Sequence, residues 1–449
     1  MAQNINRGNL PMMKLTLPLI GEQFFRILIS SVDTIMLSSF SESAVAGVGL
    51  VSQWVFFLQI LINVVCIGSN IVLAQYLGAN KSNEELNHIA KSGFTMTMII
   101  SLILSIIVFS LTPFLLSCYT LEEEVRQCAQ SYFLIYAGIG AIFTGLSSFQ
   151  TGILRTYGYT KETLIVTIIS NIINVFGNAV AIFGLFGLPK TGAAGVAVAS
   201  TISVIVGNII MFFMIRKRKI IQFKLFNSPK VPKSMYKLIL SIGLPTAGES
   251  LAYNTAQITI MAMITTLGTY AMDCQVYTQT IVRFVFAIAV AIGNAVQIKV
   301  GYLVGAGLKD EAYKKVWKYS LVATSCSMIL ILLVNLIKTP IIHIFTRQPE
   351  VFELTSRMLL FSIYIEFGRS LNLIYVGALK GAGDVKFPVG YGVLSMWGIM
   401  VVLSWLLGLK LGMGVIGCWL GIGTDETTRG IVMLFRWKSK HWQKYRLIK

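Results

Sequence analysis

The chain has 449 residues, of which 55% are hydrophobic and only 12% are charged, and its mean hydropathy is +0.73. Soluble globular domains have about 25% charged residues, so this composition excludes that class and indicates an integral membrane protein. In a soluble protein the net charge of +18 would suggest nucleic-acid binding. In a membrane protein its distribution among the loops matters more, and we expect no nucleic-acid partner.

Long uncharged runs predict membrane-spanning helices. Several of them, such as 92–121 and 163–189, exceed the ~20 residues that a helix needs to cross a bilayer. Strands of a membrane barrel would be shorter, and polar and apolar residues would alternate along them. The polar first residues lead into the first span without a cleavage pattern, so we expect an uncleaved chain. Twelve spans are predicted, near residues 15–40, 48–77, 93–117, 129–153, 163–187, 193–215, 236–266, 275–304, 319–344, 354–378, 387–408 and 413–435.

The first span, LPLIGEQFFRILISSVDTIML (17–37), contains the carboxylates of Glu22 and Asp33. A carboxylate near the middle of a spanning helix costs roughly 2.5–3.5 kcal/mol, so we expect it to be paired, to face a cavity or to function. Glu22 has Arg26 one turn later, which predicts a local ion pair. Asp33 has no cation at the neighbouring helical positions, so nothing local neutralises it.

Cys118 and Cys128 flank the loop between the third and fourth spans, so either a disulfide or two separate thiols is open. The six cysteines form no CxxC pair and no cluster with histidine, which argues against a structural metal or redox site.

Three asparagines of the fifth span, Asn171, Asn174 and Asn178, recur at spacings that place them along one helical face. Amide oxygens can replace part of the hydration shell of an ion, and a nearby carboxylate supplies the charge. The alternative is hydrogen bonding between helices, worth about 0.6 kcal/mol for each amide.

Lysine and arginine crowd into alternate loops, most of all in the segment that begins RKRK (216–219) and in the tail from 436 to 449. The loops between them are sparse in charge or acidic, as in LEEEVRQ (121–127). The positive-inside rule therefore predicts that both termini and the central loop are cytoplasmic. The basic residues are also expected to contact anionic membrane lipids.

An internal repeat divides the chain. LPLIGEQ (17–23) recurs as LPTAGES (244–250), and the same shift of 227 places LGAN (77–80) on VGAG (304–307). LRTYGYTK (154–161) matches LKGAGDVK (379–386) at a shift of 225. Each half holds six spans, which predicts two lobes related by a pseudo-twofold axis along the membrane normal. We expect an N-terminal lobe (1–215), a cytoplasmic basic linker (216–237) and a C-terminal lobe with a basic tail (238–449).

Two acidic residues stand out in the second half. Glu249 is the repeat partner of Glu22, but its helical neighbours include no cation, so we expect it to function rather than to form an ion pair. Glu366 has Arg369 three residues later, which predicts a bridge that stabilises its lobe.

Several of these motifs carry a family resemblance. LKGAGDVKFP (379–388), SVDTIMLSSF with LAQYLGA, NIINVFGNAVAIFG (171–184) and GAAGVAVAS (192–200) resemble signatures of the MATE family, the multidrug and toxic compound extrusion transporters. The resemblance covers nearly the whole chain. It implies two six-helix lobes and a central cavity that opens alternately to each side. It also implies efflux driven by inward flow of protons or sodium ions.

The resemblance also implies a cation site. Asp33 matches the aspartate of the first span that belongs to it, and Asn174 fits the asparagine of the fifth span. Asn178 stands where the family commonly has an aspartate, which removes one negative charge and leaves the choice between protons and sodium open. Ser200 falls where a threonine is frequent. Glu249 resembles a working glutamate of the seventh span, though closer to the proline.

We therefore expect a monomeric antiporter of the cell membrane that exports organic, often cationic, compounds. It needs no cofactor beyond its coupling ion, H⁺ or a Na⁺ bound at Asp33, Asn174 and Asn178. The three histidines lie at or outside span ends and form no catalytic motif, so no enzyme activity is expected. Candidates for the substrate cavity are Glu22, Gln275, Tyr277 and Glu366. The alternative is a lipid-linked oligosaccharide flippase of the same superfamily, which Arg26, Arg283, Lys299 and Arg369 keep open.

Overall fold

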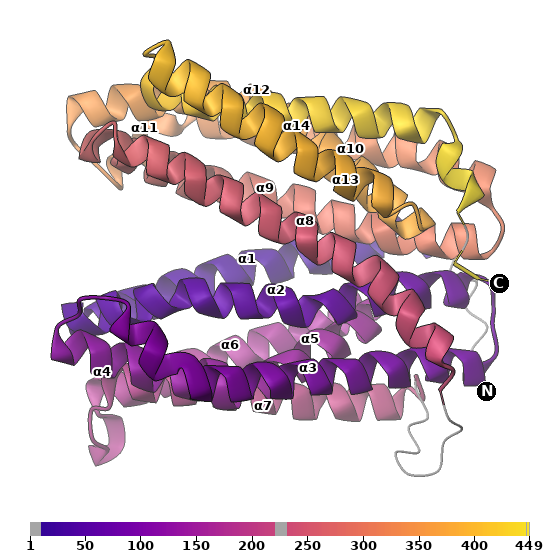
Figure 1. Ribbon diagram of the computed structural model, residues 1–449, viewed down its shortest axis with the longest axis horizontal. Helices are drawn as coiled ribbons and strands as arrows, with labels where there is room; N and C mark the ends of the chain where they lie inside the picture. Colours follow the sequence, from indigo (N-terminus) through magenta and orange to yellow (C-terminus); the bar gives the residue numbers. More distant parts are fainter. Residues whose placement is uncertain (1–9, 221–230, 446, 449) are drawn as a thin grey trace. The chain divides into compact units, whose positions relative to one another are not determined.

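The computed structural model describes residues 10–220, 231–445 and 447–448 (Figure 1). These residues form helices joined by short turns, without a strand among them. Ten helices of the described part are long and apolar enough to cross a membrane. The predicted all-α membrane fold is confirmed.

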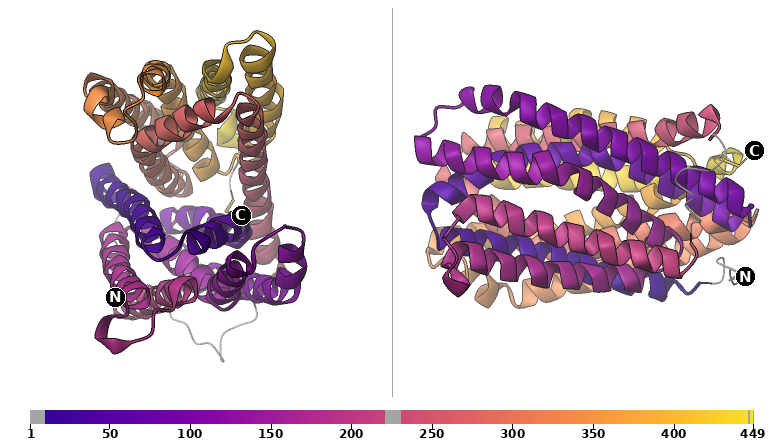
Figure 2. Two further views of the ribbon diagram at one scale, coloured as in Figure 1. Left: turned by 90° about the vertical axis from the view of Figure 1, so that its left-hand side faces the viewer. Right: turned by 90° about the horizontal axis from the view of Figure 1, so that it is seen from below.

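Close packing divides the chain into two compact units. Unit 1 consists of Met1–Leu73 and Lys81–Ala247, and unit 2 of Ala74–Asn80 and Gly248–Lys449. The long helices within each unit run roughly along a common direction (Figure 2). Residues 221–230 of the expected linker lie outside the described residues, and the expected lobe boundaries remain a prediction.

The first half of the chain contains seven helices in the described residues. They are α1 (Met12–Ser38), α2 (Glu42–Gly78), α3 (Asn83–Ser117), α4 (Glu123–Tyr132), α5 (Gly140–Thr156), α6 (Thr160–Phe183) and α7 (Gly192–Lys217). A π-helical segment, Phe133–Ile139, joins α4 to α5, so that Glu123–Thr156 forms one span. The 3₁₀ turn Leu185–Gly187 follows α6.

The second half also has seven helices within its described residues. They are α8 (Lys233–Thr265), α9 (Thr269–Gly305), α10 (Lys309–Leu336), α11 (Lys338–His343), α12 (Pro349–Ala382), α13 (Lys386–Ser395) and α14 (Gly414–Lys438). Two π-helical segments, Met396–Val401 and Ser404–Lys410, extend α13 into one span, and the 3₁₀ turn His441–Lys444 follows α14.

The helices differ from the predicted spans in two respects. The span predicted at 319–344 is α10, which begins ten residues earlier at Lys309, and α11, which follows the break at Ile337. The spans predicted at 236–266 and 413–435 coincide with α8 and α14, which are not among the ten helices that are long and apolar enough to cross a membrane. Charged residues within or at the ends of both helices lower their hydropathy.

The backbone repeats at the positions where the sequence repeats. Asn80 and Gly307, related by the shift of 227, both have a positive φ, of 51° and 80°. Gly158 and Gly383, related by the shift of 225, have φ values of 88° and 96°. Glycine, and to a lesser degree asparagine, adopts this left-handed conformation at low cost, so each motif ends its helix in both halves.

The structure has all six cysteines as free thiols, with Cys118 exposed and Cys128 half-buried.

Candidate functional site

A polar cavity of about 440 Å³ lies inside unit 1. α1, α5, α6 and α7 provide most of its wall, and Asp33 of α1 is the carboxylate that lines it. Arg26 and Tyr136 also line it, and the rest of the polar lining is hydroxyl and amide groups, from Ser30, Gln59, Ser147, Thr151, Thr163, Thr167, Ser170, Asn171, Asn174, Ser200 and Ser203. Such a wall can solvate a small polar ligand or ion inside an otherwise apolar helical unit.

Asp33 stands at the end of a chain of hydrogen bonds. Asn178 Nδ2 donates to Asp33 Oδ1 at 2.7 Å and also lies 3.3 Å from Asn174 Oδ1. Asn174 Nδ2 in turn donates to Ser200 Oγ at 2.9 Å. The structure thus brings together four of the residues that the sequence singled out, from α1, α6 and α7.

The Asp33 carboxylate has no basic side chain within ion-pair distance among the described residues, and Asn178 Oδ1 is buried there without a donor. The site therefore combines one carboxylate with neutral oxygens. Such a set can take up a proton or coordinate one monovalent cation. In the described part of the chain no group of three or more His, Cys, Asp or Glu side chains is placed so that it could hold a metal ion.

Asn171 lies one turn before Asn174 on the same face of α6 and also lines the cavity. Its Nδ2 donates to the carbonyl oxygen of Phe25 at 3.4 Å. This weak bond ties α6 to α1, so Asn171 stands beside the chain of bonds from Asp33 to Ser200 and not within it.

Glu22 is buried and paired, as the sequence predicted. Arg26 Nη2 lies 3.1 Å from Glu22 Oε1, and Arg155 Nη2 of α5 bonds to the same oxygen. Thr163 Oγ1 lies 3.4 Å from Glu22 Oε2. Two cations therefore neutralise Glu22, and the sequence analysis missed the second of them, Arg155.

Glu249 also has a counterion, so the expectation that it lacks one is wrong. Lys380 Nζ of α12 lies 2.6 Å from Glu249 Oε2, and both residues are largely buried. Lys380 follows Arg155 by the repeat shift of 225, and Glu249 follows Glu22 by 227. The same ion pair thus occurs in both units, and its base comes from a distant helix rather than from a helical neighbour.

A larger network of buried charges lies in unit 2. The predicted bridge is confirmed, with Glu366 Oε1 2.5 Å from Arg369 Nη1. Arg369 also reaches Glu426 at 3.4 Å, and Arg429 lies 2.8 Å from Asp425 and 3.4 Å from Glu426.

Polar neighbours complete this network. Asn372 Nδ2 donates to Glu426 at 2.8 Å, and Ser395 Oγ donates to Asp425 at 2.5 Å. The sequence analysis missed the α14 residues of the network, although TDETTR (424–429) places three charges inside a predicted span.

The remaining cavity candidates lie in unit 2 on α9. Gln275 is buried, and its Oε1 has no donor among the described residues. Tyr277 packs against Phe345, with ring centroids 5.3 Å apart. The structure places neither residue in contact with Glu366.

Two of the four basic residues that kept the flippase alternative open are neutralised. Arg26 is paired with Glu22, and Arg369 with Glu366 and Glu426.

Comparisons with known proteins agree with the two-unit architecture. The family model MatE matches residues 18–180 and 245–406. The uncharacterized transporter YisQ of Bacillus subtilis (strain 168) is 34% identical over 428 residues, which cover 95% of this chain and 94% of the relative. The probable multidrug resistance protein NorM of Thermotoga maritima is 26% identical over 442 residues, covering 96% and 93%.

A solved structure shares the fold. It is described as the outward-facing conformation of a multidrug resistance MATE family transporter of the MOP superfamily. The match has a TM-score of 0.87 and 17% identity and covers 97% of this chain and 96% of that one.

Proposed function

Since the chain belongs to the MATE (MatE) family, whose members are membrane transporters and not enzymes, we propose that it exports organic compounds in exchange for protons or sodium ions. It is a multi-pass membrane protein, and we propose that it acts as a monomer in the cell membrane with both termini in the cytoplasm. Its substrates are small organic molecules, often cationic and amphipathic.

The observation that carries this proposal is the uncompensated carboxylate of Asp33. It lines a polar cavity whose wall is mainly amide and hydroxyl groups, and the basic residue of that wall, Arg26, is paired with Glu22 and not with Asp33. A charge without a partner inside a membrane protein is costly unless an ion or a proton occupies the site during its working cycle. Asp33, Asn174, Asn178 and Ser200 therefore form the coupling site, with Asn171 at its edge.

Coupling follows from the charge of Asp33. In the outward-facing state an arriving proton or Na⁺ neutralises the carboxylate and removes the cost of repacking the helices around it. The neutral site then favours the arrangement that has released the substrate. A tenfold preference of the ion for one state corresponds to about 1.4 kcal/mol, which a single buried charge can supply.

The buried pairs of Glu22 and Glu249 have a structural role in this scheme. Because each glutamate already holds a cation of the protein, a transported ion would have to displace a basic side chain. The sequence analysis placed Glu249 among the coupling residues. We propose instead that its ion pair with Lys380 holds α8 and α12 together. Pairing of Arg26 and Arg369 with acids also disfavours an anion-binding cavity of the kind that a flippase requires.

Purified protein in proteoliposomes tests the proposal. Efflux of a panel of organic cations is measured with a proton gradient and with a sodium gradient, imposed separately. We expect one gradient to drive transport, and Asp33→Asn to abolish it. Glu123→Gln removes an exposed carboxylate of the same unit and should leave efflux unchanged. Equal transport by wild type and Asp33→Asn would contradict the assignment.

A further inference from the structure

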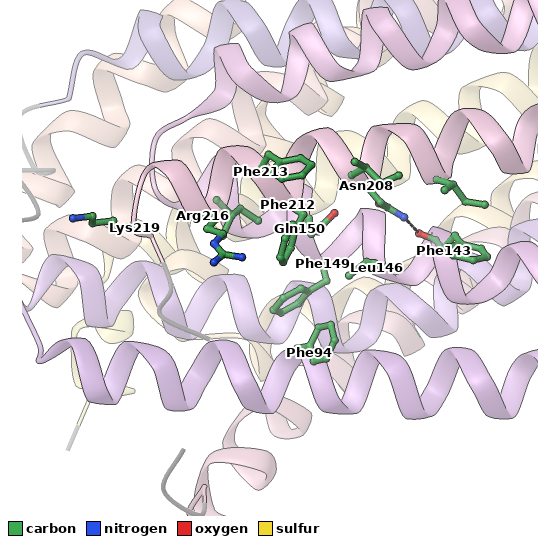
Figure 3. Close-up of a pocket in the computed structure, with 13 residues that line it drawn as sticks. Phe94, Phe143, Leu146, Phe149, Gln150, Asn208, Phe212, Phe213, Arg216 and Lys219 are labelled. Atoms are coloured by element: carbon green, nitrogen blue, oxygen red, sulfur yellow. Dashed lines mark hydrogen bonds between the residues drawn. The ribbon is translucent and has the colours of Figure 1, made fainter. Parts of the chain in front are cut away.

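A second cavity of unit 1, of about 750 Å³, lies between α3, α5 and α7 (Figure 3). Phenylalanine and aliphatic side chains line most of it, and two basic residues line one end. Its lining residues are Phe94, Phe143, Leu146, Phe149, Gln150, Ile205, Asn208, Ile209, Phe212, Phe213, Ile215, Arg216 and Lys219. Asp33 and its hydrogen-bond partners are not among them, so this groove is distinct from the coupling site.

The apolar part of the groove opens on the outer face of the unit. Phe94 and Phe149 pack edge to face with ring centroids 5.9 Å apart. Phe212 and Phe213 are 48% and 63% exposed, and Ile209 is 50% exposed. On a membrane-spanning helix such side chains meet hydrocarbon. An acyl chain therefore fits this part of the groove.

The basic end of the groove has the charge that an anionic headgroup needs. Arg216 lies in the last turn of α7 and Lys219 just beyond it, and Figure 3 shows both at the same end. Neither forms an ion pair with an acid of the described residues. Their neighbour Arg218 differs, since it lies 3.0 Å from Glu162 and its guanidinium stacks over Tyr159. The loop charges predict that this end faces the cytoplasm.

We propose that this groove binds one anionic glycerophospholipid of the cytoplasmic leaflet. The phosphate lies between Arg216 and Lys219, and an acyl chain runs along the phenylalanines toward Ile209. The seven helical steps from Ile209 to Arg216 span roughly 10 Å, which is shorter than an extended acyl chain. The two cations also offset the negative end of the α7 dipole, which would otherwise repel a phosphate.

Two amides of the groove wall are only partly hydrogen-bonded. Gln150 Oε1 and Asn208 Oδ1 are buried and have no donor among the described residues. Asn208 Nδ2 is bonded to the carbonyl oxygen of Phe143 at 2.8 Å, which fixes its orientation.

Native mass spectrometry of the purified full-length protein tests the site. The protein is titrated with phosphatidylglycerol and, separately, with phosphatidylcholine of the same acyl chains. We expect one phosphatidylglycerol to bind more tightly than phosphatidylcholine. Arg216→Gln/Lys219→Gln should weaken it about 25-fold, since a basic residue near an anionic lipid contributes about fivefold. Lys161→Gln/Lys217→Gln removes two exposed charges nearby and should leave the affinity unchanged.

A third variant tests the contribution of the apolar part of the groove separately from that of the two basic residues. Ile209→Trp fills the apolar part without altering a charged group, so it should also abolish tight binding. Inorganic phosphate at the same concentration should not displace the lipid, because it has no acyl chain. Equal binding of the two lipids, full affinity in the Arg216/Lys219 variant, or displacement by phosphate would each overturn the proposal. Since the readout is lipid binding, it is independent of whether Asp33 couples transport.

Discussion

In unit 1 the carboxylate of Asp33 accepts a hydrogen bond from the Asn178 amide and has no basic side chain within ion-pair distance among the described residues, whereas in unit 2 Glu249, Glu366 and Glu426 each meet a lysine or an arginine. Asp33 is half-buried and the three glutamates are buried, but burial does not decide their roles. The difference lies in whether the protein itself supplies the cation. A carboxylate that holds a protein cation is a structural element, and one without it is free to take up an ion from solution.

The repeat sharpens this comparison. Glu22 with Arg155 and Glu249 with Lys380 are the same ion pair in the two units, at equivalent positions of the repeat. The shift of 227 places Asp33 on Ile260, which is buried and apolar. The ion pair is thus shared by the two units, and the uncompensated acid belongs to unit 1. A feature that only one unit has is a better candidate for coupling than a feature of the common scaffold.

The largest loss of efflux is expected when a basic side chain is placed beside Asp33. Asn178→Lys places an ammonium group beside Asp33 and copies the arrangement of Glu249 and Lys380. Because the carboxylate then has a permanent partner, gradient-driven efflux should fall to the level of protein-free liposomes. Asn178→Gln keeps the amide and should retain part of the activity. Wild-type efflux by a folded Asn178→Lys protein would contradict the claim that coupling requires an acid without a basic partner.

The next effect concerns stability and the role of Glu249. Glu249→Gln leaves the Lys380 ammonium buried without a partner, which should cost about 3–5 kcal/mol of unfolding free energy. Glu249→Gln/Lys380→Met removes both charges and should recover most of that loss in a thermal unfolding scan in detergent. The double variant should also keep more than half of the wild-type efflux. Loss of efflux in a well-folded double variant would return Glu249 to the coupling site.

Much of this fold could be predicted from the sequence, because membrane spans depend on local composition. Three features depend only on residues near one another in the chain and can be predicted locally. They are the long apolar helices, the glycines that end helices at 158 and 383, and the ion pair of Glu366 with Arg369. The grouping of Asp33 with Asn174 and Asn178 came from the family resemblance. Its hydrogen bonds agree with that grouping, and its role in coupling remains a proposal.

The partners of Glu22 and Glu249 illustrate what local patterns miss. Helical neighbours were searched for cations, but Arg155 and Lys380 are more than 130 residues away from their acids. The signal was nevertheless in the sequence, since the two acids lie in one repeated motif and the two bases in another. Two repeats that each retain an acid and a base predict a contact that helical periodicity cannot.

Within the coupling site, Asn174→Ala should have a moderate effect. It removes one neutral oxygen and the bond to Ser200, but it leaves the charge of Asp33 in place. A net hydrogen bond contributes about 0.5–1.5 kcal/mol, so we expect up to about tenfold weaker apparent affinity for the coupling ion. The apparent affinity is measured from the dependence of efflux on the concentration of the coupling ion. An unchanged dependence would remove Asn174 from the site.

The smallest effect is expected for Ser200→Ala. Its hydroxyl accepts from Asn174 and does not contact Asp33, so it orients the amide rather than the carboxylate. Apparent ion affinity should fall about twofold to threefold, less than for Asn174→Ala. Ser92→Ala, which removes a hydroxyl bonded to its own helix outside the cavity, is the matched control and should behave as wild type. A larger loss for Ser200→Ala than for Asn174→Ala would reverse the order that the geometry predicts.

The most direct measurement of the central claim compares two transport modes of Asp33→Asn in the same proteoliposomes. Net efflux driven by the ion gradient requires the charge of Asp33, whereas exchange of labelled for unlabelled substrate without a gradient requires only a substrate site and a mobile scaffold. The account predicts that Asp33→Asn loses gradient-driven efflux but keeps substrate exchange. Gradient-driven efflux at the wild-type rate, with an unchanged dependence on the gradient, would contradict it.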